Sequence, residues 1–258
     1  MKKILLFVSI IGILFSGCKS DKLTMATAAN FAPFEYINGG EFQGIDIEVA
    51  RIIASELGKE LVISDMEFDS VVQSVASKNT DIGISGLTMN KTRKQVIDFS
   101  DTYFNAAQML ITKENDERFK NLKTKEDVIK AINQIKDLKI GVQAGTTGEF
   151  YSKGDKDWGF EGFKGAKTIS FTNGAMALTA MLNNQIDIVI IDEMPARVLT
   201  KTNKGTELIN IALTDEEYAI AVSKGNEELL SKINEILRAI KQDGRMQAII
   251  NKYYAQSK

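Results

Sequence analysis

Residues 78–88, KNTDIGISGLT, form the stretch around which this chain is organised. A polar turn leads into a predicted strand over 81–85, and the strand runs into Gly86-Leu87-Thr88. The segment before the turn, residues 69–77, is predicted to be a helix that Asp69 can cap. A helix that carries the chain from one strand to the next is typical of α/β folds, so we expect a parallel sheet.

The segments upstream extend this pattern to strand, helix, strand, helix, strand. Residues 23–28 and 61–63 have the composition of short strands. Between them, residues 46–57 carry apolar side chains at helical spacing, and Gly58 follows where a glycine commonly ends a helix. A complete α/β unit is therefore predicted before Gly86.

The middle of the chain repeats the first part. Its predicted elements are a helix, a strand, a helix and a strand, over residues 124–135, 139–142, 173–182 and 186–192. The first of these helices opens with a variant of the capping box, Thr124-Lys125-Glu126-Asp127. The last strand, IDIVIID, ends at Asp192 and echoes residues 81–85. We expect two similar α/β lobes whose strands end at a shared cleft.

The end of the chain is predicted to return to the first lobe. A strand over 219–222 and helices over 226–240 and 243–254 need a sheet to pack on. The chain would then cross between the lobes near 105–110 and 213–218, and two crossings form a hinge. The expected division gives lobe 1 residues 23–105 and 219–258, and lobe 2, with the hinge segments, residues 106–218.

Four positions can hold both charges of a small zwitterion. Gly86 and Thr88 can offer backbone N–H groups and a hydroxyl, and Arg93 offers a planar fork that matches a carboxylate. Asp192 can bind an ammonium group. Removing both charges from water costs several kcal/mol each unless they are matched, so we expect both lobes to contribute.

Composition favours binding over catalysis. The 258 residues contain no histidine and one cysteine, which leaves few routes to a metal site, and we expect no metal and no cofactor. The net charge of −2 and the absence of a long basic run argue against nucleic acid as a partner.

The N-terminus has the pattern of a signal peptide over residues 1–17. Two lysines precede an apolar run of about a dozen residues, shorter than the roughly 20 that a membrane-spanning helix needs. Cys18 follows small residues in a context that resembles the lipobox of bacterial lipoproteins, with Phe15 where that box usually has leucine. Lipidation of Cys18 would leave residues 18–22 as a tether outside the cytoplasm.

Four motifs follow one another along the chain: residues 30–36 (NFAPFEY), residues 43–48 (QGIDIE), Gly86-Leu87-Thr88 with Arg93, and residues 188–192. Together they resemble the extracytoplasmic solute-binding proteins of polar amino acid ABC transporters. The resemblance implies a two-lobe periplasmic-binding-protein fold (type II) with the ligand between the lobes. It also implies a free amino acid as ligand, a membrane permease with its ATPase as partner, and a monomeric protein.

The resemblance assigns further residues to the ligand site. Phe31 and Phe68 resemble the aromatic residues that flank the ligand side chain. Arg93 resembles the arginine that binds the ligand carboxylate, and Thr146 and Thr147 match the contacts of the second lobe. Asp192 resembles the aspartate that binds the ammonium group, assisted by the Thr88 hydroxyl and the Gly86 carbonyl. Each also has an ordinary reading: core packing for the two aromatic residues, solvent exposure for Arg93, a tight turn at 145–148 and a helix cap for Asp192.

Specificity is less clearly encoded. Relatives that bind glutamine or basic amino acids often have an acid three positions before the first aromatic residue, where this chain has Ala28. Gln143 stands where glutamine-binding relatives have a lysine. These positions favour an uncharged amino acid, although Glu35, Glu149 or Asp155 could reach the ligand and reverse that preference.

Two other classes of function stay open. The same fold is used by periplasmic dehydratases that act on cyclic acids, for which Glu35 and Glu193 are the candidate acid or base. The chain could also serve as a detached ligand-sensing subunit.

Overall fold

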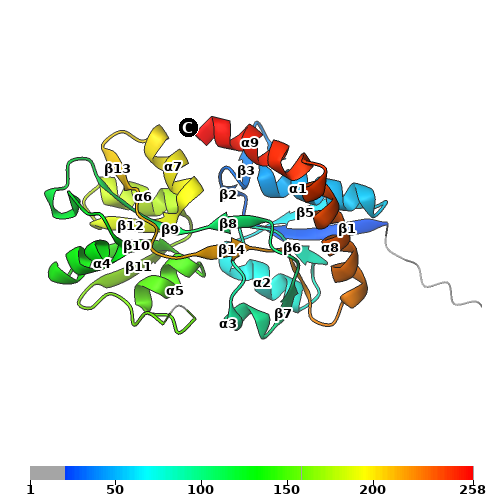
Figure 1. Ribbon diagram of the computed structural model, residues 1–258, viewed down its shortest axis with the longest axis horizontal. Coiled ribbons are helices and arrows are strands. Elements are labelled where there is room, and N and C mark those ends of the chain that lie inside the picture. Colours follow the sequence, from blue (N-terminus) through cyan, green and yellow to red (C-terminus); the bar gives the residue numbers. More distant parts are fainter. Residues whose placement is uncertain (1–20, 158, 258) are drawn as a thin grey trace, which may run out of the picture.

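The computed structural model describes residues 21–157 and 159–257. The expected signal peptide and Cys18 lie outside the described residues. Two α/β lobes lie side by side along the long axis of the molecule (Figure 1). The strands β8 (Phe104–Ala106) and β14 (Glu216–Tyr218) run between the lobes and pair antiparallel, with Glu216 opposite Ala106. These two strands form the hinge.

The sheet of lobe 1 has the order β5-β1-β6-β15-β7. Its strands are β1 (Lys22–Thr27), β5 (Glu60–Asp65), β6 (Ile82–Gly83), β7 (Ile97–Phe99) and β15 (Ala221–Ser223). The predicted parallel arrangement is confirmed for β5, β1 and β6. The strand expected near 219–222 is β15, whose direction the sequence left open, and it runs antiparallel to β6 and β7. The reason is that β15 follows directly from the hinge and enters the sheet at the end where β6 leaves it.

The sheet of lobe 2 has the corresponding order β11-β10-β12-β9-β13. Its strands are β9 (Gln108–Lys113), β10 (Lys139–Gln143), β11 (Lys167–Phe171), β12 (Ile188–Asp192) and β13 (Thr206–Ile209). Here β11, β10 and β12 are parallel, and β9, which also follows from the hinge, runs antiparallel to β12 and β13. The two lobes therefore repeat one arrangement, as the sequence echo indicates.

Helices cover both sheets, and a small antiparallel sheet lies beside α1. The helices are α1 (Ile45–Glu56), α2 (Phe68–Ala76), α3 (Lys91–Lys94), α4 (Lys125–Gln134), α5 (Thr147–Lys153), α6 (Gly174–Leu182), α7 (Glu193–Thr202), α8 (Glu227–Gln242) and α9 (Arg245–Ser257), with a 3₁₀ turn at Glu117–Phe119. The small sheet consists of β2 (Asn30–Phe31), β3 (Glu35–Asn38) and β4 (Glu41–Gln43). Within residues 21–157 and 159–257, no helix is long and apolar enough to cross a membrane.

The helix ends test the local predictions. Leu57 is the C-cap of α1 and Gly58 adopts a φ of 65°, as predicted. The capping box at the start of α4 is confirmed. The predicted cap of α2 is wrong, because α2 begins one residue before Asp69, with Glu67 at the N-cap position and no side-chain capping bond.

The C-terminal helices α8 and α9 pack on α1, and α9 also contacts α7 of lobe 2 (Figure 1). The Tyr253 hydroxyl donates to the Glu48 carboxylate at 2.6 Å and accepts from the Gly44 N–H at 3.2 Å. These contacts attach the end of the chain to the start of α1.

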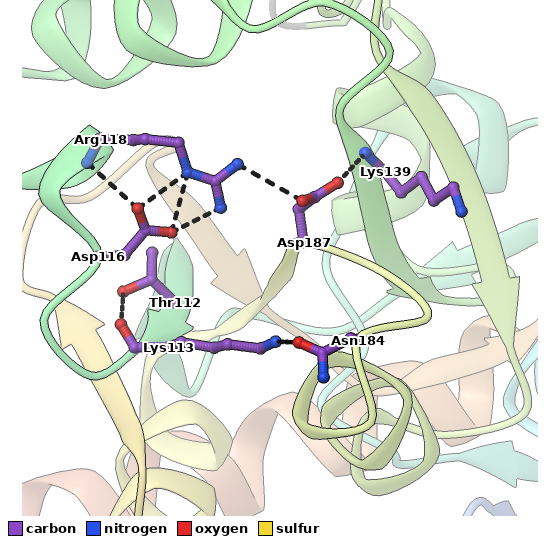
Figure 2. Close-up of polar contacts among 7 residues, drawn as sticks. All are labelled: Thr112, Lys113, Asp116, Arg118, Lys139, Asn184 and Asp187. Atoms are coloured by element: carbon purple, nitrogen blue, oxygen red, sulfur yellow. Dashed lines mark hydrogen bonds and ion pairs between the residues drawn. The ribbon is translucent and has the colours of Figure 1, made fainter.

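A polar cluster fixes the start of β12 (Figure 2). The Asp187 carboxylate accepts from the Lys139 N–H at 2.9 Å and from the Arg118 guanidinium at 3.4 Å. Arg118 is itself held by Asp116, with a shortest contact of 2.6 Å. In the turn before β12, the Asn184 side chain contacts the Lys113 ammonium group. The cluster holds one end of β12, and Asp192 lies at the other.

Candidate ligand-binding site between the lobes

The carboxyl ends of the central strands of both lobes meet where the lobes face each other. Thr88 follows β6 in lobe 1, while Gln143 ends β10 and Asp192 ends β12 in lobe 2. Arg93 joins the two sides directly. Its guanidinium donates to the Thr88 carbonyl oxygen at 2.7 Å and, in the other lobe, to the Gly145 carbonyl oxygen at 3.0 Å.

Arg93 is the buried residue of α3. Its neighbours Lys91 and Lys94 are exposed, whereas only 5% of Arg93 is accessible, so the solvent-facing alternative is wrong. The guanidinium carbon lies 5.4 Å from the centre of the Phe68 ring. Burial lowers the pKa of Arg93 to about 10, although the negative charges of Glu216 and Asp192 oppose that shift. Arg93 therefore stays positively charged at neutral pH.

Asp192 supplies the opposite charge from lobe 2. Its carboxylate accepts from the Gln108 amide at 2.8 Å and from the Tyr218 hydroxyl. Asp192 occupies the N-cap position of α7 but makes no side-chain capping bond, so its side chain is not used as a helix cap. Burial, reinforced by the charge of Glu216, raises the pKa of Asp192 to about 7.

Gly86 has a role inside lobe 1. Its N–H donates to the Asp46 carboxylate at 2.7 Å, which corrects the expectation that this donor faces a ligand. Gly86 adopts a φ of +51°, and a Cβ there would lie 3.0 Å from the Phe31 ring and 3.3 Å from the Tyr218 ring. The glycine thus allows two aromatic rings to approach the end of β6.

The two threonines of lobe 2 use their hydroxyls within the protein. The Thr146 hydroxyl donates to the Gln143 carbonyl oxygen at 2.8 Å and accepts from the Glu149 N–H, so it caps α5. The segment is therefore the start of a helix rather than an isolated turn. The Thr147 hydroxyl donates to Glu216 at 2.8 Å and accepts from Gln108 at 3.0 Å. Neither hydroxyl retains a proton to donate to a ligand carboxylate.

The two aromatic residues that were predicted to flank the ligand side chain lie beside other predicted site residues. Phe31 packs against Gly86, and Phe68 lies beside Arg93, with 7% and 8% of their surfaces accessible. Gln143 is also buried, and its Oε1 has no hydrogen-bond partner among the described residues. An unpaired buried acceptor costs about 1–3 kcal/mol. A ligand N–H group could satisfy it.

The three acids that could alter specificity are engaged elsewhere. Glu35 is buried and accepts from the Ser85 hydroxyl at 2.8 Å. Glu149 accepts from the Gly145 N–H and from Lys153. Asp155 lies in a loop, where its carboxylate accepts from the Asp157 N–H at 2.6 Å.

Three buried residues at the site are missing from the sequence prediction: Gln108, Glu216 and Tyr218. Gln108 connects Asp192 with Thr147, and Tyr218 binds Asp192. A signal for all three was available, because Gln108 lies in the predicted crossing at 105–110 and the other two lie in the crossing at 213–218. Alternation along a strand places residues two apart on one face.

The charged groups at the site fit a ligand that carries both charges. A buried cation, Arg93, comes from lobe 1 and a buried anion, Asp192, from lobe 2, while a second buried acid, Glu216, lies on the hinge strand β14. Within residues 21–157 and 159–257, no group of three or more His, Cys, Asp or Glu side chains is placed to hold a metal ion. Two α/β lobes with a hinge and such a site define a two-lobed solute-binding protein.

Comparison with known proteins gives the family. The model of the bacterial extracellular solute-binding proteins, family 3, matches residues 23–256, and the chain belongs to this family. The arginine-binding extracellular protein of Bacillus subtilis (strain 168) is 28% identical over 248 residues, which cover 94% of this chain and 91% of that protein.

Solved structures of amino acid-binding proteins are similar to this chain. A substrate-binding protein of an amino acid ABC transporter from Streptococcus pneumoniae, bound to L-arginine, has a TM-score of 0.79 at 30% identity and covers 92% of this chain and 96% of that one. An ancestral amino acid-binding protein, described as a precursor of cyclohexadienyl dehydratase, has a TM-score of 0.78 at 28% identity. It covers 90% of this chain and 95% of that one.

Proposed function

We propose that this protein binds a free amino acid outside the cytoplasm by closing its two lobes around it, and delivers it to an ABC transporter permease. The observation that carries the proposal is the pair of buried opposite charges, Arg93 in lobe 1 and Asp192 in lobe 2. A zwitterion that contacts both lobes favours the closed state, because only differential affinity can shift such an equilibrium. The family and the transporter proteins among the relatives support this function.

In this proposal each end of the amino acid has its own partners. Arg93 binds the carboxylate, assisted by the backbone at Thr146 and Thr147. Asp192 binds the ammonium group together with the Thr88 hydroxyl. Phe31 and Phe68 flank the ligand side chain, and the unpaired Gln143 oxygen accepts from it. We assign no catalytic step, because Glu35 is bonded to Ser85 and Glu193 is paired with Arg197 at 2.8 Å.

Attachment to the membrane through a lipid on Cys18 belongs to the same proposal. The support is the placement of the single cysteine directly after an apolar leader. Mass spectrometry of the detergent-extracted protein is expected to find a diacylglyceryl group on an N-terminal Cys18, and Cys18→Ser is expected to lose it. An unmodified Cys18 in the mature protein would contradict the anchor without affecting the ligand site. We expect the protein to act as a monomer.

A thermal-shift screen tests the binding function. Protein starting at Lys19 is unfolded and refolded to remove bound ligand, then heated with each of the twenty amino acids, ornithine, citrulline and cystine. A ligand that binds only the native state stabilises it by RT ln(1 + [L]/Kd), about 2.7 kcal/mol at a hundredfold excess over Kd. A rise in Tm with one or a few amino acids is expected. No response across the set would reject the proposal.

A further inference from the structure

Glu216 is a buried carboxylate on the hinge strand β14 that contacts both lobes. Its Oε2 accepts from the Thr88 hydroxyl of lobe 1 at 2.6 Å and from the Thr147 hydroxyl of lobe 2 at 2.8 Å. Its Oε1 accepts from the Thr214 hydroxyl at 2.6 Å. Only 3% of Glu216 is accessible, whereas the adjacent Glu217 is exposed. Three hydroxyl donors therefore hold the Glu216 carboxylate where the two lobes meet.

This arrangement fixes what the threonine hydroxyls can offer a ligand. A hydroxyl has one proton to donate and lone pairs that accept. Thr88 and Thr147 both give their proton to Glu216. Only lone pairs remain at Thr88, so its hydroxyl can accept from an ammonium group but cannot donate to a carboxylate. Glu216 thereby determines which end of a zwitterion lies beside Thr88.

Glu216 also changes the charge balance of the site. A continuous set of hydrogen bonds runs from Asp192 through Gln108 and Thr147 to Glu216. The buried groups around the ligand position thus include two acids, Asp192 and Glu216, and one cation, Arg93. A zwitterion with a neutral side chain leaves this balance unchanged. A ligand with a second carboxylate adds another negative charge to a poorly solvated region, where repulsion is only weakly screened.

We propose that Glu216 sets the charge selectivity of the cleft, so that amino acids with acidic side chains are rejected and those with neutral or cationic side chains are accepted. The inference rests on the proposed function, since it concerns which amino acids enter the same site. It differs from the sequence expectation in placing the selective charge on the hinge rather than near Ala28. Negative charge built against a competing ligand is a general route to specificity.

The test is isothermal titration calorimetry at pH 8 with glutamine, glutamate and arginine. Wild-type protein is expected to bind glutamate at least about 100-fold more weakly than glutamine. Glu216→Gln keeps the shape of the side chain and an oxygen that can accept from both threonines, but removes the charge. We expect it to reduce the ratio of the glutamate Kd to the glutamine Kd by about tenfold or more, a change of about 1.4 kcal/mol. Arginine is expected to lose affinity relative to glutamine.

Glu217→Gln is the matched control, because it removes the same charge from the exposed neighbouring position. It is expected to leave unchanged the affinities of glutamate and of arginine relative to that of glutamine. If Glu217→Gln lowers the ratio of the glutamate Kd to the glutamine Kd as much as Glu216→Gln does, the effect comes from the net charge of the protein and the proposal is overturned. The proposal also fails if Glu216→Gln leaves the ratio unchanged while binding persists.

The wild-type ratio is a second criterion that does not depend on folding of the variant. Glutamate binding within about threefold of glutamine binding overturns the charge selectivity while leaving the amino acid receptor intact. Absence of binding by any amino acid overturns the receptor function and the inference that rests on it. The two failures are therefore distinguishable.

Discussion

The guanidinium of Arg93 in lobe 1 and the carbonyl oxygen of Gly145 in lobe 2 are 3.0 Å apart and hydrogen-bonded. The bond brings the residue proposed to hold the ligand carboxylate into direct contact with the opposite lobe. Ligand binding and lobe closure therefore share one side chain, and changes on either side of this contact should affect both.

Gly145→Ala is expected to weaken ligand binding by about tenfold or more. Gly145 has a φ of +74°, and a Cβ there would lie 2.9 Å from the Asp69 Cα of lobe 1. The added methyl group therefore hinders closure as well as straining the backbone. Gly205→Ala is the control, because Gly205 has a similar φ of +81° and its nearest atom would be 3.9 Å away. Calorimetry that finds equal affinities for the two variants would contradict a steric role in closure.

Asp192→Asn is expected to lower amino acid affinity by about 100-fold, because a buried charge partner of the ammonium group is lost. Unliganded stability should not fall, since the neutral amide keeps the shape of the side chain and burial already makes the charged form of Asp192 costly at neutral pH. Calorimetry measures the affinity, and thermal unfolding without ligand measures the stability. Unchanged affinity in the variant would remove Asp192 from the site.

Affinity is expected to fall as the pH drops below about 7. The raised pKa of Asp192, about 7, means that below this pH the carboxyl is increasingly protonated and cannot pair with an ammonium group. The decrease should approach about tenfold per pH unit, the limit for one linked proton. Titrations between pH 5.5 and pH 8 test this, and Asp192→Asn should lose the dependence. A flat wild-type profile would contradict the assignment.

Stability of the unliganded protein should change with pH in the opposite direction. The pKa values of Asp192 (about 7), Asp46 (about 6) and Glu35 are all raised in the folded state, with burial as the main cause. Between pH 4 and pH 7 the folded state binds more protons at these groups than the unfolded state does. Their contribution to the free energy of unfolding therefore decreases as the pH rises. Urea unfolding across this pH range should show that the free energy of unfolding decreases less steeply in Asp192→Asn than in wild type.

Tyr218→Phe is expected to reduce affinity by about tenfold and to move the pH dependence to higher pH. The Tyr218 hydroxyl donates to Asp192 and so stabilises the charged carboxylate, and hydrogen bonds to charged groups contribute about 1.5–3 kcal/mol. Tyr103→Phe is a useful comparison, because its hydroxyl donates to Asp46 instead. A midpoint of the affinity profile that does not move in Tyr218→Phe would contradict this coupling.

Much of the fold could be predicted from local patterns. The helix end at Gly58 and the capping box at Thr124 depend on neighbouring residues only, and both are confirmed. The direction of β15 could not be predicted in this way, since it depends on how the hinge returns to the sheet. The start of α2 was misplaced because Asp69 is a suitable cap by type but lies inside the first turn.

At the ligand site, too, local patterns could be predicted, whereas contacts between residues far apart in the sequence could not. Arg93 and Asp192 were predicted from residue type and motif, and the structure buries both. The sequence did not reveal that the Gly86 N–H is taken by Asp46 or that the Thr147 hydroxyl is taken by Glu216. Such pairings join residues 40 and 69 positions apart, and only the folded backbone brings them together.

The position of Glu216 on the hinge has a mechanical consequence. When two bodies turn about a pivot, groups near the axis travel little and groups far from it travel furthest. Glu216 and Tyr218 lie on a strand that connects the lobes, and Tyr218 contacts Asp192 there. Asp192, the residue proposed to bind the ammonium group, is thus held beside the pivot, whereas the Arg93 contact with Gly145 joins the two lobes directly. We expect the ammonium site to change little as the lobes turn, and the Arg93 contact to break when they separate.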